Sequence, residues 1–271
     1  MKKLLVAGAA LSALLGTPAL AADMALKAPP PPAAPPCVWC GWYAGLNVGG
    51  AWSNASDPFF GNAATALFFA ANEFPTSVSP NAKGVIGGGQ IGYNWAASQN
   101  IIIGLEADIQ GSGLKGTGTV TPGVVGPIPF APFTTSVEEH SNWFGTIRGR
   151  LGVVSTPNLL IYGTGGLAYG QTEASFSTIA TGFTLATCPF LFTCTVGNSS
   201  TTRAGWTAGG GFEWMFTPHW SIKAEYLYID LGNQTATAFP TPGGFANPGF
   251  TFSATARFRE NIARAGVNWH F

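Results

Sequence analysis

Apolar and polar residues alternate along much of the chain beyond residue 40, and this alternation restricts the fold more than any other feature. In "IIIGLEADIQ" (101–110), the odd positions are apolar, and Glu106, Asp108 and Gln110 stand at even positions. Successive side chains of a β-strand point to opposite faces. The segment therefore predicts a strand with one apolar face and one face that carries its charges.

Eight segments follow this pattern. They are 41–52, 84–95, 101–110, 142–153, 159–170, 202–214, 220–228 and 259–271. The segments between them alternate between short turns, such as "AASQN" and "STPN", and much longer links. A barrel that crosses a membrane has this arrangement, with tight turns at its periplasmic end and long loops at its extracellular end.

Composition excludes several other classes. Charged residues make up 9% of the chain and hydrophobic residues 46%, which fits neither an ordinary soluble domain nor a disordered chain. The formal net charge is zero, so the chain lacks the basic character of nucleic-acid-binding proteins. Beyond the N-terminal segment no apolar run is long enough for a membrane helix, and the other structure that satisfies every backbone group in lipid is a closed β-barrel. The predicted fold is therefore all-β: an eight-stranded antiparallel transmembrane up-and-down barrel with four long extracellular loops and short periplasmic turns.

The N-terminal residues predict export. Lys2 and Lys3 precede an apolar run, and the following "TPALAAD" supplies Ala19 and Ala21 as the small residues of a cleavage site. This pattern is typical of a secretory signal peptide for Sec-dependent export. The predicted divisions are the signal peptide (1–21), a proline-rich periplasmic segment (22–40) and the barrel (41–271).

Aromatic residues gather at the ends of the predicted strands. At the periplasmic ends they are Trp42, Tyr93, Trp95, Trp214, Trp220, Trp269 and Phe271, and at the outer ends they are Trp52, Trp143 and Tyr228. Amphipathic rings at both interfaces form the two girdles of a membrane barrel. This distribution favours lipid on the apolar face and a polar lumen.

Charges of both signs face the predicted lumen. The acidic residues are Glu106, Asp108, Glu213 and Glu225, and the basic residues are Arg148, Arg150, Lys223 and Arg264. An eight-stranded barrel is just wide enough for side chains to fill it, and buried charges are costly unless paired. We therefore expect a neutral, salt-bridged plug. The alternative is a gate whose ion pairs exchange partners and pass water or small ions.

The cysteines form two close pairs, and export places both in an oxidising compartment. Cys188 and Cys194 lie in the third long loop, where we expect a disulfide. Cys37 and Cys40 stand in a C-x-x-C arrangement just before the first strand, where a disulfide is again favoured. A redox-active pair, or a zinc site completed by the periplasmic-rim residues His219 and His270, are the alternatives.

One segment suggests an enzyme. Some outer-membrane barrels hydrolyse lipids with a Ser–His–acid set, and "EEHSNW" contains Glu138, His140 and Ser141. Adjacent residues of a strand point to opposite faces, so His140 and Ser141 are poorly placed to act together. We therefore expect no catalytic residues, no metal and no cofactor.

Two of the long loops, "DPFFGNAATALFFAANEF" and "AFPTPGGFANPGFTF", are rich in Phe, Pro and Gly and almost uncharged. Exposed apolar patches often mark contact surfaces. Adhesion or self-association is therefore one expectation, and loops that fold over their own phenylalanines to cap the barrel are the other.

The segments "ALAAD", "GWYAGLNVGGAWS", "FGTIRGRLGVV", "LIYGTGGLAYG" and "RAGVNWHF" occur in order along the chain. Together they resemble the small outer-membrane β-barrel proteins of alphaproteobacteria, known as outer-membrane immunogenic or porin-like surface proteins. The resemblance implies a location in the outer membrane, an eight-stranded barrel and antigenic surface loops. By resemblance to outer-membrane barrels generally, Phe271 is the assembly signal read by the barrel-assembly machinery.

The expected function is that of a structural, antigenic and interacting surface protein with a salt-bridged lumen. A narrow porin-like channel for ions or small solutes is the alternative, and a lipid-modifying enzyme is a more distant one. The expected partners are outer-membrane lipid, lipopolysaccharide and the assembly machinery.

Overall fold

The computed structural model describes residues 37–54, 56–70, 72, 74–123, 133–180, 194–240 and 251–271. Residues Cys37–Phe271 form one compact unit. Its elements are β1 (Gly41–Trp52), β2 (Asp57–Gly61), α2 (Ala66–Ala70), β3 (Ser77–Val78), β4 (Lys83–Ala96), β5 (Ile101–Val120), β6 (Phe133–Thr156), β7 (Leu159–Ala180), β8 (Cys194–Thr217), β9 (Trp220–Pro240) and β10 (Phe252–His270). Among the described residues, no helix is long and apolar enough to cross a membrane.

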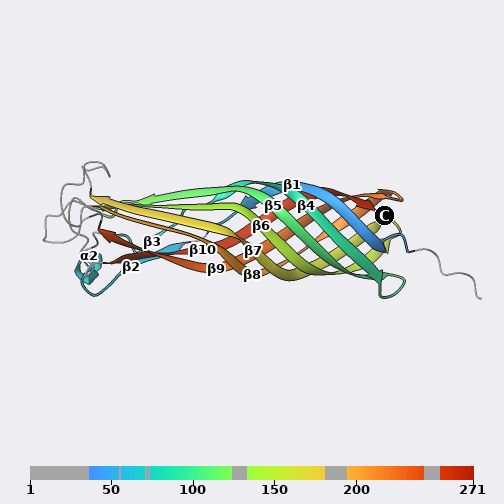
Figure 1. The fold of residues 1–271 in the computed structure, drawn as a ribbon, viewed down its shortest axis with the longest axis horizontal. Coiled ribbons are helices and arrows are strands. Elements are labelled where there is room, and N and C mark those ends of the chain that lie inside the picture. The colour runs from blue at the N-terminus through green and yellow to red at the C-terminus, as the bar shows by residue number, and fades with distance from the viewer. Residues whose placement is uncertain are drawn as a thin grey trace, which may run out of the picture. The chain divides into compact units, whose positions relative to one another are not determined.

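Eight antiparallel strands close into a ring (Figure 1). Its order is β1-β4-β5-β6-β7-β8-β9-β10, and β10 pairs with β1 to complete it. The closing register places Tyr43 opposite His270 and Trp52 opposite Asn261. The predicted eight-stranded antiparallel barrel is confirmed.

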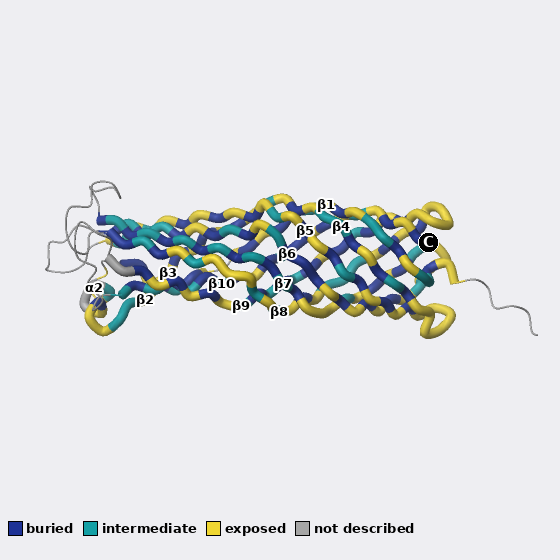
Figure 2. The backbone as a smooth tube through the Cα atoms, viewed as in Figure 1, coloured by how far each residue is buried: buried dark blue, intermediate teal, exposed yellow. Residues whose placement is uncertain are grey.

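Burial alternates residue by residue along the strands (Figure 2). On β5, Leu105 and Ile109 are 55% and 60% exposed, whereas Glu106 and Asp108 between them are buried. A soluble protein would hide these apolar side chains and expose the carboxylates. The inverted pattern is the one required when lipid surrounds the outer face and side chains fill the lumen.

The strands are longer than the alternation predicted. The fourth predicted segment covered 142–153, but β6 runs from Phe133 to Thr156. In the added part, serine and threonine replace the apolar residues on the outer face, so the hydrophobic signal of a strand is missing there. Hydroxyl groups pair across the strands instead, with Thr119 and Ser136 3.1 Å apart. Much of the predicted extracellular loop length is therefore sheet that continues beyond the membrane.

The first long loop also contains secondary structure that the sequence did not indicate. After β1 ends at Trp52, β2 pairs with the outer part of β10 and β3 pairs with β2. Phe59 and Phe74 from this loop are buried against Phe252 of β10, with ring centroids 6.3 and 4.7 Å from it. This loop thus folds over its own phenylalanines at the outer end of the barrel.

Candidate functional site

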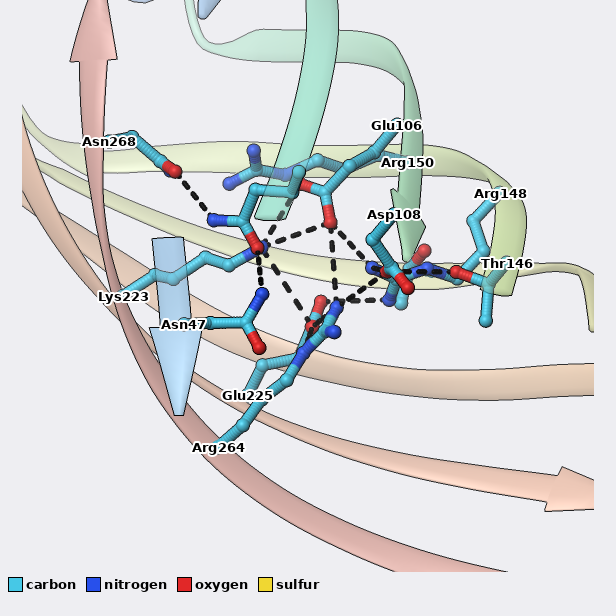
Figure 3. A network of polar contacts seen from close by, with 12 residues as sticks. Asn47, Glu106, Asp108, Thr146, Arg148, Arg150, Lys223, Glu225, Arg264 and Asn268 are labelled. Carbon is cyan, nitrogen blue, oxygen red and sulfur yellow. Dashed lines mark hydrogen bonds and ion pairs between the residues drawn. The ribbon is translucent and has the colours of Figure 1, made fainter. Parts of the chain in front are cut away.

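Eight charged side chains from five strands meet inside the barrel, and Figure 3 labels all of them except Glu213. β5 carries Glu106 and Asp108, β6 carries Arg148 and Arg150, β8 carries Glu213, β9 carries Lys223 and Glu225, and β10 carries Arg264. Each occupies the inward-facing positions of its strand, because residues two apart share a face. All eight are at most 5% exposed. These are the eight lumen residues that the sequence predicted.

Arg148 is the centre of this network. Its guanidinium contacts Glu106, donates to Asp108 Oδ2 at 2.9 Å and donates to Glu225 Oε1 at 3.0 Å. Arg264 bridges two of the same carboxylates, reaching Asp108 Oδ2 at 2.9 Å and Glu225 Oε2 at 2.6 Å. Two guanidinium groups therefore hold three carboxylates in one cluster.

Lys223 enters from the opposite wall. Its Nζ lies 2.9 Å from Glu106 Oε1 and 3.9 Å from Glu225 Oε2. β9 and β5 are not neighbours in the ring, so this contact crosses the lumen. An ion pair across the lumen fills it and connects distant strands.

A second ion pair lies towards the periplasm. Arg150 contacts Glu213, and Ser221 Oγ donates to Glu213 Oε1 at 2.5 Å. The guanidinium of Arg150 also lies 3.7 Å from the ring centroid of Tyr162, a cation–π distance. Both carboxylate oxygens of Glu213 therefore have partners, and the Tyr162 ring covers one face of the Arg150 guanidinium.

Neutral polar side chains complete the network. Tyr43 donates its hydroxyl to Glu106 Oε2 at 2.7 Å, and Thr146 donates to Asp108 Oδ2 at 2.8 Å. Gln90 donates to Asn268 Oδ1 at 2.6 Å and accepts from Asn47 at 2.8 Å. Sequence reasoning did not assign Tyr43 to the lumen. Its odd position, in phase with Asn47, was the available signal.

Apolar layers lie on both sides of the charges. On the outer side, Phe144, Leu227, Ile229 and Ile262 are fully buried inside the barrel. On the periplasmic side, Trp39 packs with Ile102, Leu160, Tyr162 and Met215. Low-dielectric surroundings strengthen ion pairs whose partners are already in place. The network thus lies between two buried apolar layers.

Trp39 closes the periplasmic end. Its Nε1 donates to Pro157 O at 3.2 Å, and its own carbonyl accepts from Asn94 at 3.1 Å. Cys37 and Cys40, on either side of it, are joined by a disulfide. The pair is therefore not available as zinc-binding thiolates in this structure. The disulfide predicted between Cys188 and Cys194 involves Cys188, which lies outside the described residues.

Two further candidates take different positions. His219 and His270 lie at the periplasmic rim, but His270 turns inward and its Nε2 is 3.3 Å from Glu213 Oε1. In "EEHSNW", Ser141 is buried on the inner face, whereas Glu138 is exposed on the outer face and His140 is half-buried there. His140 and Ser141 thus point to opposite sides of β6 and do not come together.

The predicted aromatic residues face outward at both ends of the barrel wall. Trp42, Trp95, Trp214, Trp220, Trp269 and Phe271 are exposed at the periplasmic end. At the other end, the outer aromatic ring consists of Trp52, Trp143, Tyr169, Trp206 and Tyr228. Sequence reasoning did not assign Tyr169 or Trp206 to it, although both share a face with apolar neighbours. The ring centroids of Tyr169 and Trp143 are 6.1 Å apart, and those of Trp206 and Tyr228 are 5.4 Å apart.

Solved structures of similar fold include the outer membrane protein OprG from Pseudomonas aeruginosa, with a TM-score of 0.47 and 11% identity, covering 86% of this chain and 97% of that one. Neisserial surface protein A has a TM-score of 0.35 and 13% identity, covering 85% of this chain and 97% of that one. At these identities the likeness concerns the fold alone.

Sequence relatives are more informative. The chain is 36% identical to the 31 kDa outer-membrane immunogenic protein of Brucella melitensis over 230 residues, which covers 83% of this chain and 86% of the relative. It is 31% identical to the 22 kDa outer membrane protein of Rhizobium leguminosarum bv. viciae over 149 residues, 54% of each chain. A family model described as "Outer membrane protein beta-barrel domain" matches residues 7–271. The chain therefore belongs to the outer membrane protein β-barrel family, is homologous to alphaproteobacterial outer-membrane immunogenic proteins, and is located in the outer membrane.

Proposed function

We propose that this barrel is a structural, antigenic and interacting surface protein whose lumen is a closed, salt-bridged plug. The observation that carries the proposal is the position of Arg148, which is fully buried and contacts three carboxylates at once. Four acidic and four basic groups balance within the network. A buried set of charges is stable only when each is paired in this way.

The dimensions of the barrel support the same proposal. Eight strands leave an interior that side chains can fill completely. Here the filling has three parts: the Trp39 layer, the charge network and the apolar layer around Phe144. An ion that crossed the lumen would have to disrupt both apolar layers and separate the ion pairs.

A narrow porin-like channel is the second candidate, and one observation favours it. Lys223 Nζ is 2.9 Å from one glutamate and 3.9 Å from another, so a small movement exchanges its partner. A cation that changes partners opens a transient path along the charged wall, as in gated pores.

Single-channel recording in planar bilayers separates the two. With the purified full-length barrel in potassium chloride, the plug predicts no defined conductance steps. Wild-type steps whose size shifts in Glu225→Gln, but not in the control Arg203→Gln, would establish the channel instead. Arg203 is a suitable control because its guanidinium donates to the backbone carbonyl of Leu231 and is not one of the network's partners.

We also infer that the protein is not an enzyme. The opposed directions of His140 and Ser141 support this inference, because a nucleophile must contact its base. Analysis of lipid A from cells that overproduce the protein tests it. The inference would be overturned if lipid A lost an acyl chain in cells that overproduce the wild type and kept it in cells that overproduce Ser141→Ala.

The proposed partners are outer-membrane lipid and lipopolysaccharide, with contacts to other surfaces through apolar loop residues. Phe60 is 47% exposed, unlike its buried neighbour Phe59, and is the side chain we expect to make such contacts. Cell attachment measured for wild type and Phe60→Ser tests this part. Unchanged attachment would remove the adhesion proposal.

A further inference from the structure

Four basic side chains gather on one arc of the barrel just beyond the outer aromatic ring. Lys83 begins β4, Lys115 lies on β5, and Arg257 and Arg259 lie on β10. β1 runs between β4 and β10 and ends at Trp52. We call these four residues the basic arc.

The register fixes where the basic arc stands relative to Trp52. Trp52 pairs with Lys83 on one side and with Asn261 on the other, and Arg259 lies two residues beyond Asn261 on the same face. Neighbouring strands are about 4.8 Å apart and each residue advances about 3.4 Å along a strand, so the backbones of Lys83 and Arg259 are separated by about 12 Å across β1. Trp52 therefore lies between the cations, at the membrane side of the group.

The cations of the basic arc are poorly compensated by the protein. Lys83 and Lys115 are directly opposite each other on β4 and β5, an arrangement in which like charges repel. Neither lysine makes an ion pair with any of the described residues, and the guanidinium of Arg257 has an electrostatic contact with the Asp57 carboxyl but forms no ion pair with it. Arg259 pairs with Asp230 at 3.1 Å, yet its side chain stays 49% exposed. The arc thus carries an excess of positive charge.

This excess is not a general property of the outer surface. On β6 and β7 the outward residues at a similar level include Glu138 and Glu173, and Glu173 accepts from Asn142 and Gln171. Arg203, in the gap where β8 and β9 are unpaired, donates to the carbonyl of Leu231. Among the described residues, the lysine and arginine side chains outside the lumen network, apart from Arg203, all lie in the sector β10–β1–β4–β5.

We propose that Lys83, Lys115, Arg257 and Arg259 bind the phosphate groups of the glycolipid in the outer leaflet. Amphipathic rings such as Trp52 lie at headgroup level, so side chains just beyond them meet the phosphates. Arginine pairs with phosphate through two parallel hydrogen bonds, and lysine reaches along apolar surface to place its ammonium in the polar layer. The inference rests on the lipid contact in the proposed function and names its residues and chemical group.

Native mass spectrometry of the full-length protein in detergent tests the proposal. The probes are lipid A with two phosphates, the same lipid A after phosphatase treatment, and phosphatidylglycerol. The wild type is expected to retain diphosphorylated lipid A at least tenfold better than either other probe. Lys83→Gln/Lys115→Gln/Arg257→Gln/Arg259→Gln is expected to lose at least tenfold in lipid A retention, and Arg203→Gln is expected to retain it.

Heat-dependent migration on gels verifies that each variant is a folded barrel. If the fourfold variant does not fold, Lys83→Gln/Lys115→Gln and Arg257→Gln/Arg259→Gln are compared separately, each with an expected loss of at least threefold. Lys83→Arg/Lys115→Arg keeps the charge and is expected to bind as the wild type does. The proposal is overturned if the wild type and the charge-removed variants retain lipid A equally well. It is also overturned if the wild type binds phosphatidylglycerol as well as it binds diphosphorylated lipid A. Conductance is independent of these measurements, so failure here is distinct from failure of the closed-lumen proposal.

Discussion

Glu106 and Arg148 are directly opposite each other on β5 and β6, and their side chains form a buried ion pair inside the barrel. The same guanidinium holds Asp108 and Glu225. Removing Arg148 therefore leaves three carboxylates with less than their full complement of positive charge. Breaking a buried pair on one side costs about 3–5 kcal/mol, because an uncompensated charge stays in a low-dielectric interior.

We accordingly expect Arg148→Met to lower the free energy of unfolding by about 3–5 kcal/mol, measured by urea titration of the barrel in detergent micelles. Arg148→Met/Glu106→Gln should recover part of the loss, since it removes one of the orphaned charges. Arg203→Gln, outside the network, should change stability far less. A loss below about 1 kcal/mol for the single variant would contradict a stabilising network.

The second prediction concerns pH and the part of the barrel beyond the membrane. Glu139 lies on β6 four residues beyond Trp143, where its side chain is close to the Asp57 carboxyl of β2. Burial, followed by the neighbouring Asp57 carboxyl, raises the pKa of Glu139 from 4.5 to about 9. Burial also raises the pKa of Asp57, whereas its bond from the Arg257 amide opposes that rise.

A raised carboxyl pKa means that the folded state holds a proton that the unfolded state has released. Stability from this group is therefore complete below pH 4.5 and is lost as pH rises towards 9. We expect amide hydrogen exchange in β2 and β3, corrected for its intrinsic pH dependence, to accelerate between these values. Glu139→Gln should remove the part of the pH dependence that extends towards 9. Burial raises the pKa of Glu260 to about 7, so the part below that value should remain. The buried Glu260 faces the same pair, and Glu260→Gln serves to separate its contribution.

The third prediction concerns the disulfide at the periplasmic end. Cys37 and Cys40 limit the conformations of the short segment that holds Trp39 in place. In Cys37→Ser/Cys40→Ser, we expect faster hydrogen exchange around the β6–β7 turn, where Trp39 donates to Pro157 O. Strand residues in the middle of β5 should exchange as in the wild type. Identical exchange at the turn would mean that packing alone positions Trp39.

The fourth prediction concerns Phe271, which is 74% exposed beside Trp42, whose carbonyl accepts its amide at 3.0 Å. If the aromatic side chain is read by the assembly machinery, Phe271→Ser should sharply lower the amount of folded barrel in the outer membrane. The unfolding midpoint of barrel refolded in vitro should change little, because the side chain packs on no buried core. Normal assembly in cells would leave Phe271 as a lipid-facing residue only.

The alternation in the sequence was sufficient to predict the strands, their facing and the charged lumen, because one physical rule governs every residue of a strand. Glu106 and Asp108 share a face for that reason alone. It could not predict that Lys223 meets Glu106, because that contact crosses the lumen and depends on the tilt and width of the closed barrel. Pairs between adjacent strands depend only on the register of those two strands. Contacts across the interior depend on how the whole sheet closes into a barrel.

Other features escaped prediction because they carry no periodic signal. Trp39 follows a proline-rich stretch and lies in a turn, so nothing in its neighbours indicated that it enters the barrel. β2 and β3 are short and lie among alanine, phenylalanine and asparagine residues without alternation. Glu139 was hidden beside Glu138 in a segment considered only for catalysis. In each case tertiary contacts, and not local sequence, determine the position.

The extension of β6 beyond Trp143 also sets how far the protein reaches from the cell. The part of β6 between Trp143 and its first residue, Phe133, is about ten residues of tilted strand and rises about 25 Å above the lipid boundary. A hydrogen-bonded sheet of that height holds its outer edge well clear of the lipid surface. Substitutions at its outer edge therefore lie far from the charged network in the lumen.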